Sequence, residues 1–281
     1  MTRFGIMQGR LVPPVADRFQ CFPRQNWADE FGFAAEAGLD CIEWIYDEFG
    51  ADVNPIATDD GIASIRELSD RHGIRVVSLC ADYFMDRPLV RATDAELKDR
   101  IDVLLWLIGR ARRTGIGRIM LPFVDVSRIV TGPELEQVVD TIMWAVPRAH
   151  EADVELHLET SLGPDRFAEL LERLPQATVK VNYDIGNSAS LGYDPRGEFA
   201  AYGDRVGSVH IKDRITGGGT VPLGSGDADF PAVFECLRSR DYTGDFILQV
   251  ARDTPGDEVR WARQNLDRVR AYVSGAAVRG G

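Results

Sequence analysis

The stretch VELHLET at residues 154–160 alternates apolar and polar side chains, which is typical of a β-strand with two unlike faces. Side chains alternate along a strand, so the two leucines point to one face and Glu155, His157 and Glu159 point to the other. The leucines are suited to pack against helices. The polar face ends in Glu159, which we expect at the carboxyl end of the strand.

Seven further apolar runs resemble this one, and helix-compatible stretches separate them. The expected strands cover residues 3–9, 40–46, 74–82, 118–124, 154–160, 179–185, 206–212 and 245–250. The expected helices cover residues 26–37, 59–72, 93–114, 132–152, 164–174, 195–203, 228–240 and 255–273. No Pro/Ser-rich linker interrupts the alternation, so the sequence predicts one (β/α)8 TIM barrel over residues 1–281. A doubly wound open sheet is the alternative fold.

Two of the expected helices begin with recognisable signals. Thr93 is followed three residues later by Glu96, which is the spacing of a capping box. Pro133 in the stretch TGPELE at 131–136 occupies a first-turn position that favours proline. These signals place the amino ends of the third and fourth long helices.

The composition is that of a soluble globular protein, with 44% hydrophobic and 27% charged residues in 281. Lys and Arg number 32 against 44 Asp and Glu, and the formal charge of −12 disfavours binding to a nucleic-acid backbone. The four cysteines are far apart and form no CxxC pair, which suggests neither a zinc knuckle nor a disulfide framework.

The amino-terminal stretch MTRFGIMQGR runs directly into the first expected strand and lacks the apolar segment of a signal peptide. No stretch approaches the roughly 20 apolar residues of a membrane span. We therefore expect a cytoplasmic enzyme without a membrane partner.

Four consecutive strands end in side chains that can bind a metal ion. By the same alternation, their last inward positions carry Glu159, Asp184, His210 and Gln249. The carboxyl ends of barrel strands meet at one face of the molecule, where active sites lie. Oxygen and imidazole ligands that converge there suit one divalent cation, with Mn²⁺ first and Mg²⁺, Co²⁺ or Zn²⁺ as alternatives.

Several motifs along the chain belong together. They are GIMQGRL at 5–11, GLDCIEWIYD at 38–47, LET at 158–160, YDIGN at 183–187, VHIKDR at 209–214, PLGSGDADFPAVFECL at 222–237 and YTGDFILQ at 242–249. With these motifs the chain resembles the xylose-isomerase-like TIM-barrel superfamily of sugar and sugar-phosphate isomerases and epimerases over nearly its whole length. The opening motif, with FP at 22–23 and IEWI at 42–45, resembles members labelled hexulose-6-phosphate isomerases.

The resemblance implies a divalent metal at the positions of Glu159, Asp184, His210 and the last strand's acid. In the ketose epimerases of this superfamily the first and last of these residues are glutamates, which bind the metal and exchange protons with opposite faces of the substrate. The resemblance also implies a small-molecule sugar or sugar phosphate as substrate, and a homodimer or homotetramer. This chain departs from the pattern at Gln249.

An amide at position 249 changes the expected mechanism. Its oxygen can bind a cation, but it does not titrate near neutral pH and cannot exchange a proton. We expect Glu159 to be the general base that takes a proton from a carbon next to a carbonyl, through an enediolate that the metal stabilises. A single base favours aldose–ketose isomerisation, whereas 3-epimerisation needs a second acid. Glu43, inward on the second strand, and Lys212 are the candidates.

Other residues near the strand ends are expected to contact substrate. Gln8 and Arg10 follow the first strand, Asn187 follows Asp184, and Arg214 follows Lys212. The two cations after His210 suit a phosphate or another anion, or pair with a neighbouring acid. The glycine-rich loop at 216–227 is a candidate flap whose backbone amides could approach a phosphate.

Three other functions are compatible with such a barrel. A metallonuclease of the endonuclease IV type has a richer set of His and acidic ligands than the four histidines here allow. A lyase or dehydratase of the inosose type would use the same site with one base. A barrel that has lost catalysis and acts as a binding protein would explain Gln249, although the trio Glu159, Asp184 and His210 argues against it.

Overall fold

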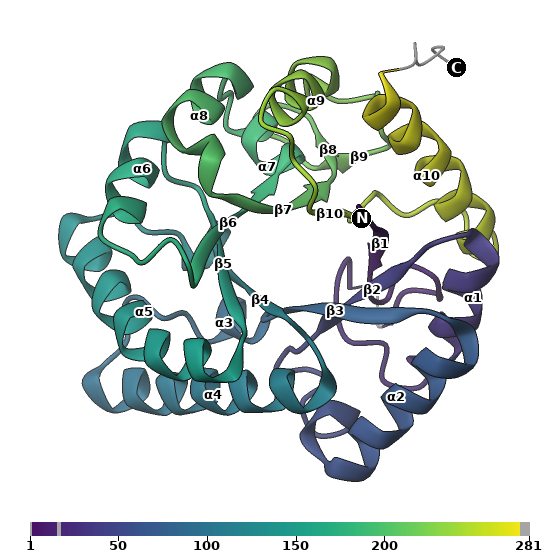
Figure 1. Cartoon of the computed structure of the whole chain (residues 1–281), viewed down its shortest axis with the longest axis horizontal. Helices are drawn as coiled ribbons and strands as arrows, with labels where there is room; N and C mark the ends of the chain where they lie inside the picture. The colour runs from purple at the N-terminus through teal and green to yellow at the C-terminus, as the bar shows by residue number, and fades with distance from the viewer. Residues whose placement is uncertain (1, 16–17, 276–281) are drawn as a thin grey trace.

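The computed structural model describes residues 2–15 and 18–275, and its parallel strands close into a ring with helices outside (Figure 1). The barrel strands are β1 (Phe4–Met7), β2 (Cys41–Ile45), β3 (Arg75–Cys80), β4 (Arg118–Phe123), β5 (Glu155–Thr160), β6 (Val179–Asp184), β7 (Val206–Ile211) and β10 (Asp245–Leu248). Strand β1 pairs with β2 on one side and with β10 on the other, so the sheet has no open edge. The (β/α)8 prediction is confirmed, and the open-sheet alternative is excluded.

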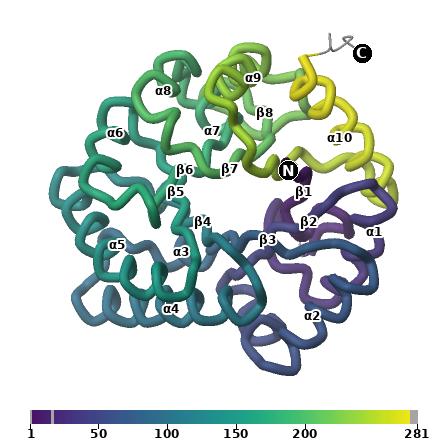
Figure 2. Tube along the Cα trace, viewed as in Figure 1, coloured from purple at the N-terminus to yellow at the C-terminus, as the bar shows by residue number. Residues whose placement is uncertain are grey.

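The helices follow the strands in the expected order, and the Cα trace passes from one βα unit to the next around the ring (Figure 2). They are α1 (Asp29–Ala37), α2 (Asp59–His72), α3 (Tyr83–Asp86), α4 (Asp94–Thr114), α5 (Gly132–Ala152), α6 (Pro164–Glu172), α7 (Ile185–Ser190), α8 (Pro195–Tyr202), α9 (Phe230–Arg238) and α10 (Glu258–Ser274). Short 3-10 turns cover Pro55–Ala57, Asp125–Ser127 and Gly203–Arg205. Among the described helices, none combines the length and apolar character that a membrane crossing requires.

Local signals in the sequence account for several helix boundaries. The side chain of Thr93 accepts a hydrogen bond from the backbone of Glu96, and the Glu96 carboxylate accepts one from the Thr93 backbone. The expected capping box is therefore confirmed, and Thr131 forms a second one with Glu134. Gly115 ends α4 with a φ of 92°, a left-handed conformation that glycine adopts without steric cost.

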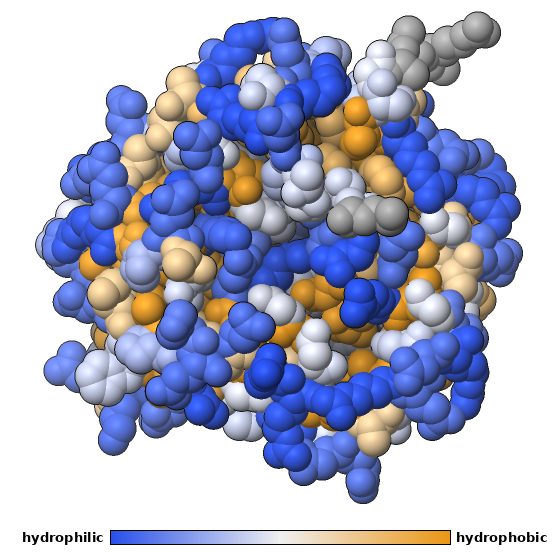
Figure 3. Space-filling view, in the orientation of Figure 1, coloured by the Kyte–Doolittle hydropathy of each residue, from blue (hydrophilic) through white to orange (hydrophobic). Residues whose placement is uncertain are grey.

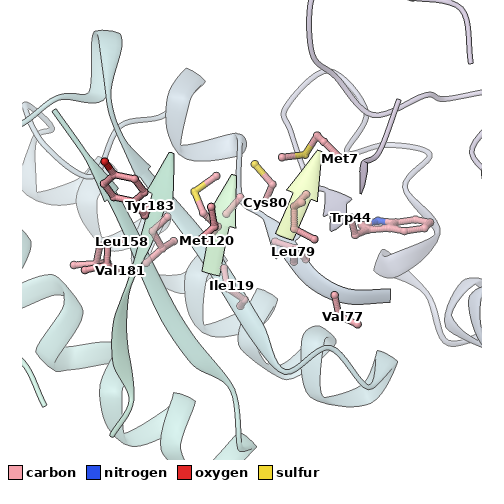
Figure 4. Close-up of a cluster of buried hydrophobic side chains, with 14 of the residues drawn as sticks. Met7, Trp44, Val77, Leu79, Cys80, Ile119, Met120, Leu158, Val181 and Tyr183 are labelled. Carbon is pink, nitrogen blue, oxygen red and sulfur yellow. The ribbon is translucent and has the colours of Figure 1, made fainter. Parts of the chain in front are cut away.

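The apolar core lies between the strands and the helices. Leu156 and Leu158 of β5 are fully buried there, as the alternation predicted. Figure 4 shows Leu158, Val181 and Tyr183 grouped together, with Met120 beside them and Cys80 farther along the same layer of buried side chains. Hydrophilic side chains cover most of the outer helices in the view of Figure 3. The barrel interior holds the polar side chains of the opposite strand face, such as His157 and Glu159, together with apolar ones such as Met120.

An ion cluster lies at the amino-terminal end of the barrel. Asp245 accepts hydrogen bonds from Arg118 Nη1 at 2.6 Å and from Arg3 Nε at 2.8 Å. The side chains of Asp245 and Arg118 are 3% and 10% exposed, so each charge depends on the other for compensation.

We expect Asp245→Ala to lower the free energy of unfolding by about 3–5 kcal/mol, because it leaves Arg118 buried without its carboxylate. Arg3→Ala is the matched control. The Arg3 side chain is 35% exposed, and loss of a partly exposed pair costs about 1 kcal/mol or less. Urea denaturation followed by circular dichroism measures both, and equal losses would contradict this account.

Candidate active site

The strand ends of β5, β6 and β7 bring Glu159, Asp184 and His210 together. Each offers one ligand atom, and these three atoms lie within 4.8 Å of one another. All three residues are buried at the carboxyl end of the barrel. The predicted convergence of these side chains is therefore present in the structure.

Two asparagines hold the Glu159 carboxylate. Asn182 Nδ2 donates to Glu159 Oε2 at 2.8 Å, and Asn187 Nδ2 donates to Oε1 at 2.6 Å. A register shift between Val181 and Asn182 places Asn182 opposite Ser208 in the neighbouring strand. Both carboxylate oxygens are thus fixed in direction by amide donors.

A column of hydrogen bonds runs from Glu159 toward the bottom of the barrel. Ser208 Oγ donates to Asn182 Oδ1 at 2.6 Å and lies 2.7 Å from His157 Nδ1. His157 Nε2 lies 2.9 Å from a Glu155 oxygen, and burial lowers the pKa of His157 to about 4. His157 therefore sits one layer below the site and supports it.

His210 is flanked by carboxylates on both ring nitrogens. Nε2 lies 2.6 Å from Glu43 Oε1, while Nδ1 faces Glu159 Oε2 at 3.3 Å and Asp184 Oδ2 at 3.9 Å without forming a hydrogen bond. Burial lowers the pKa of His210, but Glu43 and Glu159 outweigh it and raise the pKa to about 10. Glu43 is 1% exposed and lies behind His210 instead of in the pocket wall.

Gln249 uses its amide nitrogen for a contact within the protein and leaves its oxygen without one among the described residues. Its Nε2 donates to Gln20 Oε1 at 3.0 Å, and Gln20 Nε2 in turn donates to Asp82 Oδ2 at 2.7 Å. Arg10 Nη2 also donates to Gln20 Oε1, at 3.0 Å. These contacts fix the direction of both amides. Gln249 Oε1 is then buried without a partner in the described part of the chain.

These residues fit a divalent cation. Two buried polar atoms at the site, His210 Nδ1 and Gln249 Oε1, have no hydrogen-bond partner among the described residues. A cation would bind the neutral imidazole, with the ring proton on Nε2 toward Glu43 and the lone pair on Nδ1. Buried polar atoms are rarely left unpaired, and a cation that bound Glu159 and Asp184 would also pair these two. The donor set of two carboxylates, one imidazole and one amide suits Mn²⁺, Mg²⁺, Co²⁺ or Zn²⁺.

Lys212 and Arg214 converge on a single amide. Asn187 Oδ1 accepts from Lys212 Nζ at 3.2 Å and from Arg214 Nη1 at 2.8 Å, while Lys212 also donates to Asp184 Oδ2 at 2.8 Å. A Cβ at Gly186 would lie 2.7 Å from Lys212 Cγ, so glycine allows α7 to begin this close to the lysine. The two cations thereby stiffen the amide that holds Glu159.

A cavity of about 520 Å³ opens above these groups. Residues with expected roles in its wall are Glu159, Gln249, Asn187, Lys212 and Arg214. The two substrate candidates from the first strand are placed elsewhere. Gln8 is fully buried and accepts a hydrogen bond from the Ile45 backbone, and Arg10 holds the backbone oxygens of Phe19 and Val250. Neither residue lines the cavity, although Arg10 donates a hydrogen bond to Gln20, which does.

In the loop after β7, the carboxylate of Asp213 binds backbone amides of the loop itself. A short antiparallel ribbon joins β8 (Asp213–Arg214) to β9 (Thr220–Val221), and the fully buried Asp213 lies at its base. Its carboxylate accepts from the backbone amides of Gly224 at 2.8 Å, Gly226 at 3.0 Å and Ala228 at 3.2 Å. Those three amides are therefore occupied and do not approach a phosphate.

We expect Asp213→Ala to destabilise this loop, because three amides lose a charged acceptor, each worth about 1.5–3 kcal/mol and not additive. Cleavage between residues 215 and 228 in limited proteolysis should accelerate at least tenfold. Asp204→Ala, which removes an 89% exposed carboxylate, is the control and should leave the cleavage rate unchanged. Equal rates in the two variants would show that Asp213 does not order the loop.

The wall residues that were not predicted from the sequence include Gln20 and Asp82, which are joined to Gln249 by hydrogen bonds. Gln20 lies in an irregular stretch that carries no periodic signal. Asp82 is the last residue of the expected strand 74–82, at a position where inward side chains were sought on later strands. Extending the same search to the third strand would have found it.

The chain is similar in sequence to a known family and to several named enzymes. The model of the xylose isomerase-like TIM barrel family matches residues 31–272. L-ribulose-5-phosphate 3-epimerase of Salmonella paratyphi A is 26% identical over 269 residues, which cover 90% of this chain and 92% of that protein. The corresponding Escherichia coli enzyme is 25% identical over 266 residues, with the same coverage of each chain.

Solved structures share the fold. A structure of L-ribulose 3-epimerase superposes with a TM-score of 0.77 and 17% identity, covering 100% of both chains. The IOLI protein, solved with a bound zinc atom, superposes with a TM-score of 0.76 and 15% identity, covering 98% of this chain and 99% of that one. At these identities the likeness concerns the fold.

Proposed function

The chain belongs to the xylose isomerase-like TIM barrel family, and from that premise we propose that it is a metal-dependent 3-epimerase of a ketose or ketose phosphate. The observation that carries the proposal is the cluster of Glu159, Asp184 and His210 at the strand ends, with Gln249 in the same cavity wall as Glu159. The similarity to L-ribulose-5-phosphate 3-epimerases over 90% of the chain supports the same reaction class.

In this proposal Glu159 takes the proton from the carbon next to the carbonyl. Asn182 and Asn187 hold its two oxygens, so the carboxylate is oriented before substrate arrives. A cation bound by the four strand-end residues would act as a Lewis acid and stabilise the negative charge that develops on the substrate oxygens. Manganese is the metal we propose first, since carboxylate, amide and imidazole ligands suit it.

Glu43 and Lys212 take supporting roles. Glu43 contacts His210 Nε2, is buried and does not line the cavity, so we propose that it orients the imidazole. Lys212 lies in the wall, but its ammonium is held by Asp184 and Asn187. An ammonium group there can donate a hydrogen bond to a substrate oxygen, but it has no lone pair with which to take a proton from carbon.

The substrate class rests on the wall charges. Lys212 and Arg214 are suited to an anionic group, while Asp47, Asp82, Asp86 and Asp125 line the opposite part of the wall and suit hydroxyl groups. We propose a small-molecule sugar with or without a terminal phosphate, acted on in the cytoplasm by a homodimer or homotetramer.

Gln249 favours one second candidate. A site with a single base can remove an α-proton and expel a β-hydroxyl, which is the reaction of a dehydratase. Such a reaction lowers the product mass by one water, and epimerisation leaves it unchanged.

The test is a screen of ketoses and their phosphates with Mn²⁺-loaded protein in D₂O, read by NMR and mass spectrometry. We expect one ketose pair to equilibrate with deuterium at the inverted carbon and no loss of water. A metal-loaded protein that exchanges no carbon-bound proton in any pentulose or hexulose would overturn the proposed function.

A further inference from the structure

The amide at position 249 leaves the proposed epimerase with one proton-exchanging group at the strand ends. Its neighbours are arranged for an amide. A glutamate there would bring a carboxylate against Gln20 Oε1, and turning the Gln20 amide would bring that oxygen against Asp82. Position 249 therefore does not accept an acid without other changes, and a second acid must come from elsewhere.

The remaining acidic residues of the cavity wall differ in the exposure and the hydrogen bonding of their carboxyl groups. Asp47 accepts from the backbone amides of Phe22 and Gly50, one on each oxygen, and is 4% exposed. Asp86 and Asp125 are exposed at the rim. Only Asp82 is a half-buried wall carboxyl within the described residues, and its hydrogen bonds come from two side chains.

Those two side chains hold the Asp82 carboxyl beside the ligand cluster. Gln20 donates to Oδ2 at 2.7 Å, and the Cys80 thiol donates to Oδ1 at 3.1 Å. Burial raises the pKa of the Cys80 thiol well above its ordinary value, so it stays a neutral donor. Because Gln20 also contacts Gln249, the carboxyl lies one side chain away from a proposed metal ligand.

Asp82 also approaches the cavity from another direction than Glu159. It follows β3, and β4 lies between β3 and β5 in the barrel order. The two carboxyls line one cavity from separate positions around the ring, so they can approach a bound substrate carbon from different directions.

We propose that Asp82 is the second acid–base residue, which exchanges a proton with the substrate face that Glu159 does not reach. This inference rests on the proposed epimerase function. In the forward direction Glu159 takes the proton from carbon, and the C–H electron pair forms the carbon–carbon double bond of the enediolate. Protonated Asp82 then gives its proton to the same carbon from the other face. The substrate loses one proton and gains one, and solvent exchange resets both carboxyls.

The environment of Asp82 supplies a proton for this step. Burial raises its pKa to about 6, with smaller contributions from Asp47 and Glu159 in the same direction and opposing ones from Gln20 and Cys80. A fraction of the carboxyls is then protonated near neutral pH. A group with a pKa close to the working pH can serve as acid in one direction and base in the other.

The experiment compares Asp82→Asn and Glu159→Gln on each of the two epimers separately, in D₂O, with NMR detection of exchange and inversion. Asp82→Asn should lower epimerisation at least 100-fold, yet still exchange the proton of the one epimer that Glu159 deprotonates. Glu159→Gln should exchange only the proton of the other epimer. Asp204→Asn, which removes the same charge from an 89% exposed carboxylate outside the cavity, is the matched control and should retain at least a third of the wild-type rate.

Each contrary result is distinct. Epimerisation by Asp82→Asn at more than a third of the wild-type rate would overturn the role of Asp82 and leave the epimerase intact. A tenfold loss of Mn²⁺ affinity in Asp82→Asn would also overturn the role of Asp82, since it would show that Asp82 positions the ligand Gln249 through Gln20. Loss of exchange from both epimers together would also overturn it. A wild-type protein without exchange would instead refute the proposed function.

Discussion

Glu159→Gln should lower kcat for the proposed epimerisation by about 1,000-fold, within the 10²–10⁴ range of a general base. Glutamine keeps the shape of the side chain and one oxygen that can bind a cation, but it cannot accept the substrate proton. The Mn²⁺ affinity should consequently fall much less than the rate. Steady-state kinetics with metal titration by calorimetry separates the two effects.

The control for this substitution is Glu169→Gln on α6, whose carboxylate is 53% exposed and pairs with Arg166. It should leave both kcat and metal affinity as in the wild type. If Glu159→Gln kept more than a tenth of the wild-type kcat, Glu159 would not be the base, and the orienting contacts from Asn182 and Asn187 would need another explanation.

Asp184→Asn should weaken Mn²⁺ binding by more than about 100-fold, because loss of a partner behind a ligand already costs about 10–100-fold. The substitution removes one of the two carboxylates that balance a divalent charge. It also frees Lys212, whose ammonium then lies beside the cation site without its carboxylate. Elemental analysis after dialysis against Mn²⁺ should find about one ion in the wild type and far less in the variant.

Asp204→Asn removes an acid at the surface and serves as the control for metal content. Chelation of the wild-type protein should abolish turnover, and added Mn²⁺ should restore it. Equal metal content in the wild type and Asp184→Asn would place the ion elsewhere and remove the basis for the proposed Lewis acid.

Strand alternation predicted most of this architecture because the barrel interior and exterior differ so clearly in polarity. The same two-residue period that buried Leu156 and Leu158 under the helices placed Glu159 at the strand end. The expected strands ran too long at their carboxyl ends, as β3 ends at Cys80 and β10 at Leu248. At these ends the chain turns into the loops that build the pocket, where pairing stops but side chains still face inward.

Contacts between distant segments could not be predicted in this way. Gln20 reaches Gln249 and Asp82 only because Arg10 and the irregular stretch after β1 fold across the barrel mouth. Likewise, nothing in the order of residues indicated that Asp213 would occupy the amides of the glycine-rich loop. Such pairings depend on tertiary geometry, for which neither propensity nor periodicity contains a signal.

The Asp213 carboxylate has a consequence for how substrate binds. In many enzymes a mobile loop becomes ordered only when the ligand's own phosphate reaches its amides, and part of the binding energy offsets that ordering. Here an internal carboxylate has satisfied the amides of Gly224, Gly226 and Ala228 during folding. The entropy of loop ordering thus belongs to the folding equilibrium, and in the proposed function a substrate phosphate is not needed to order this loop.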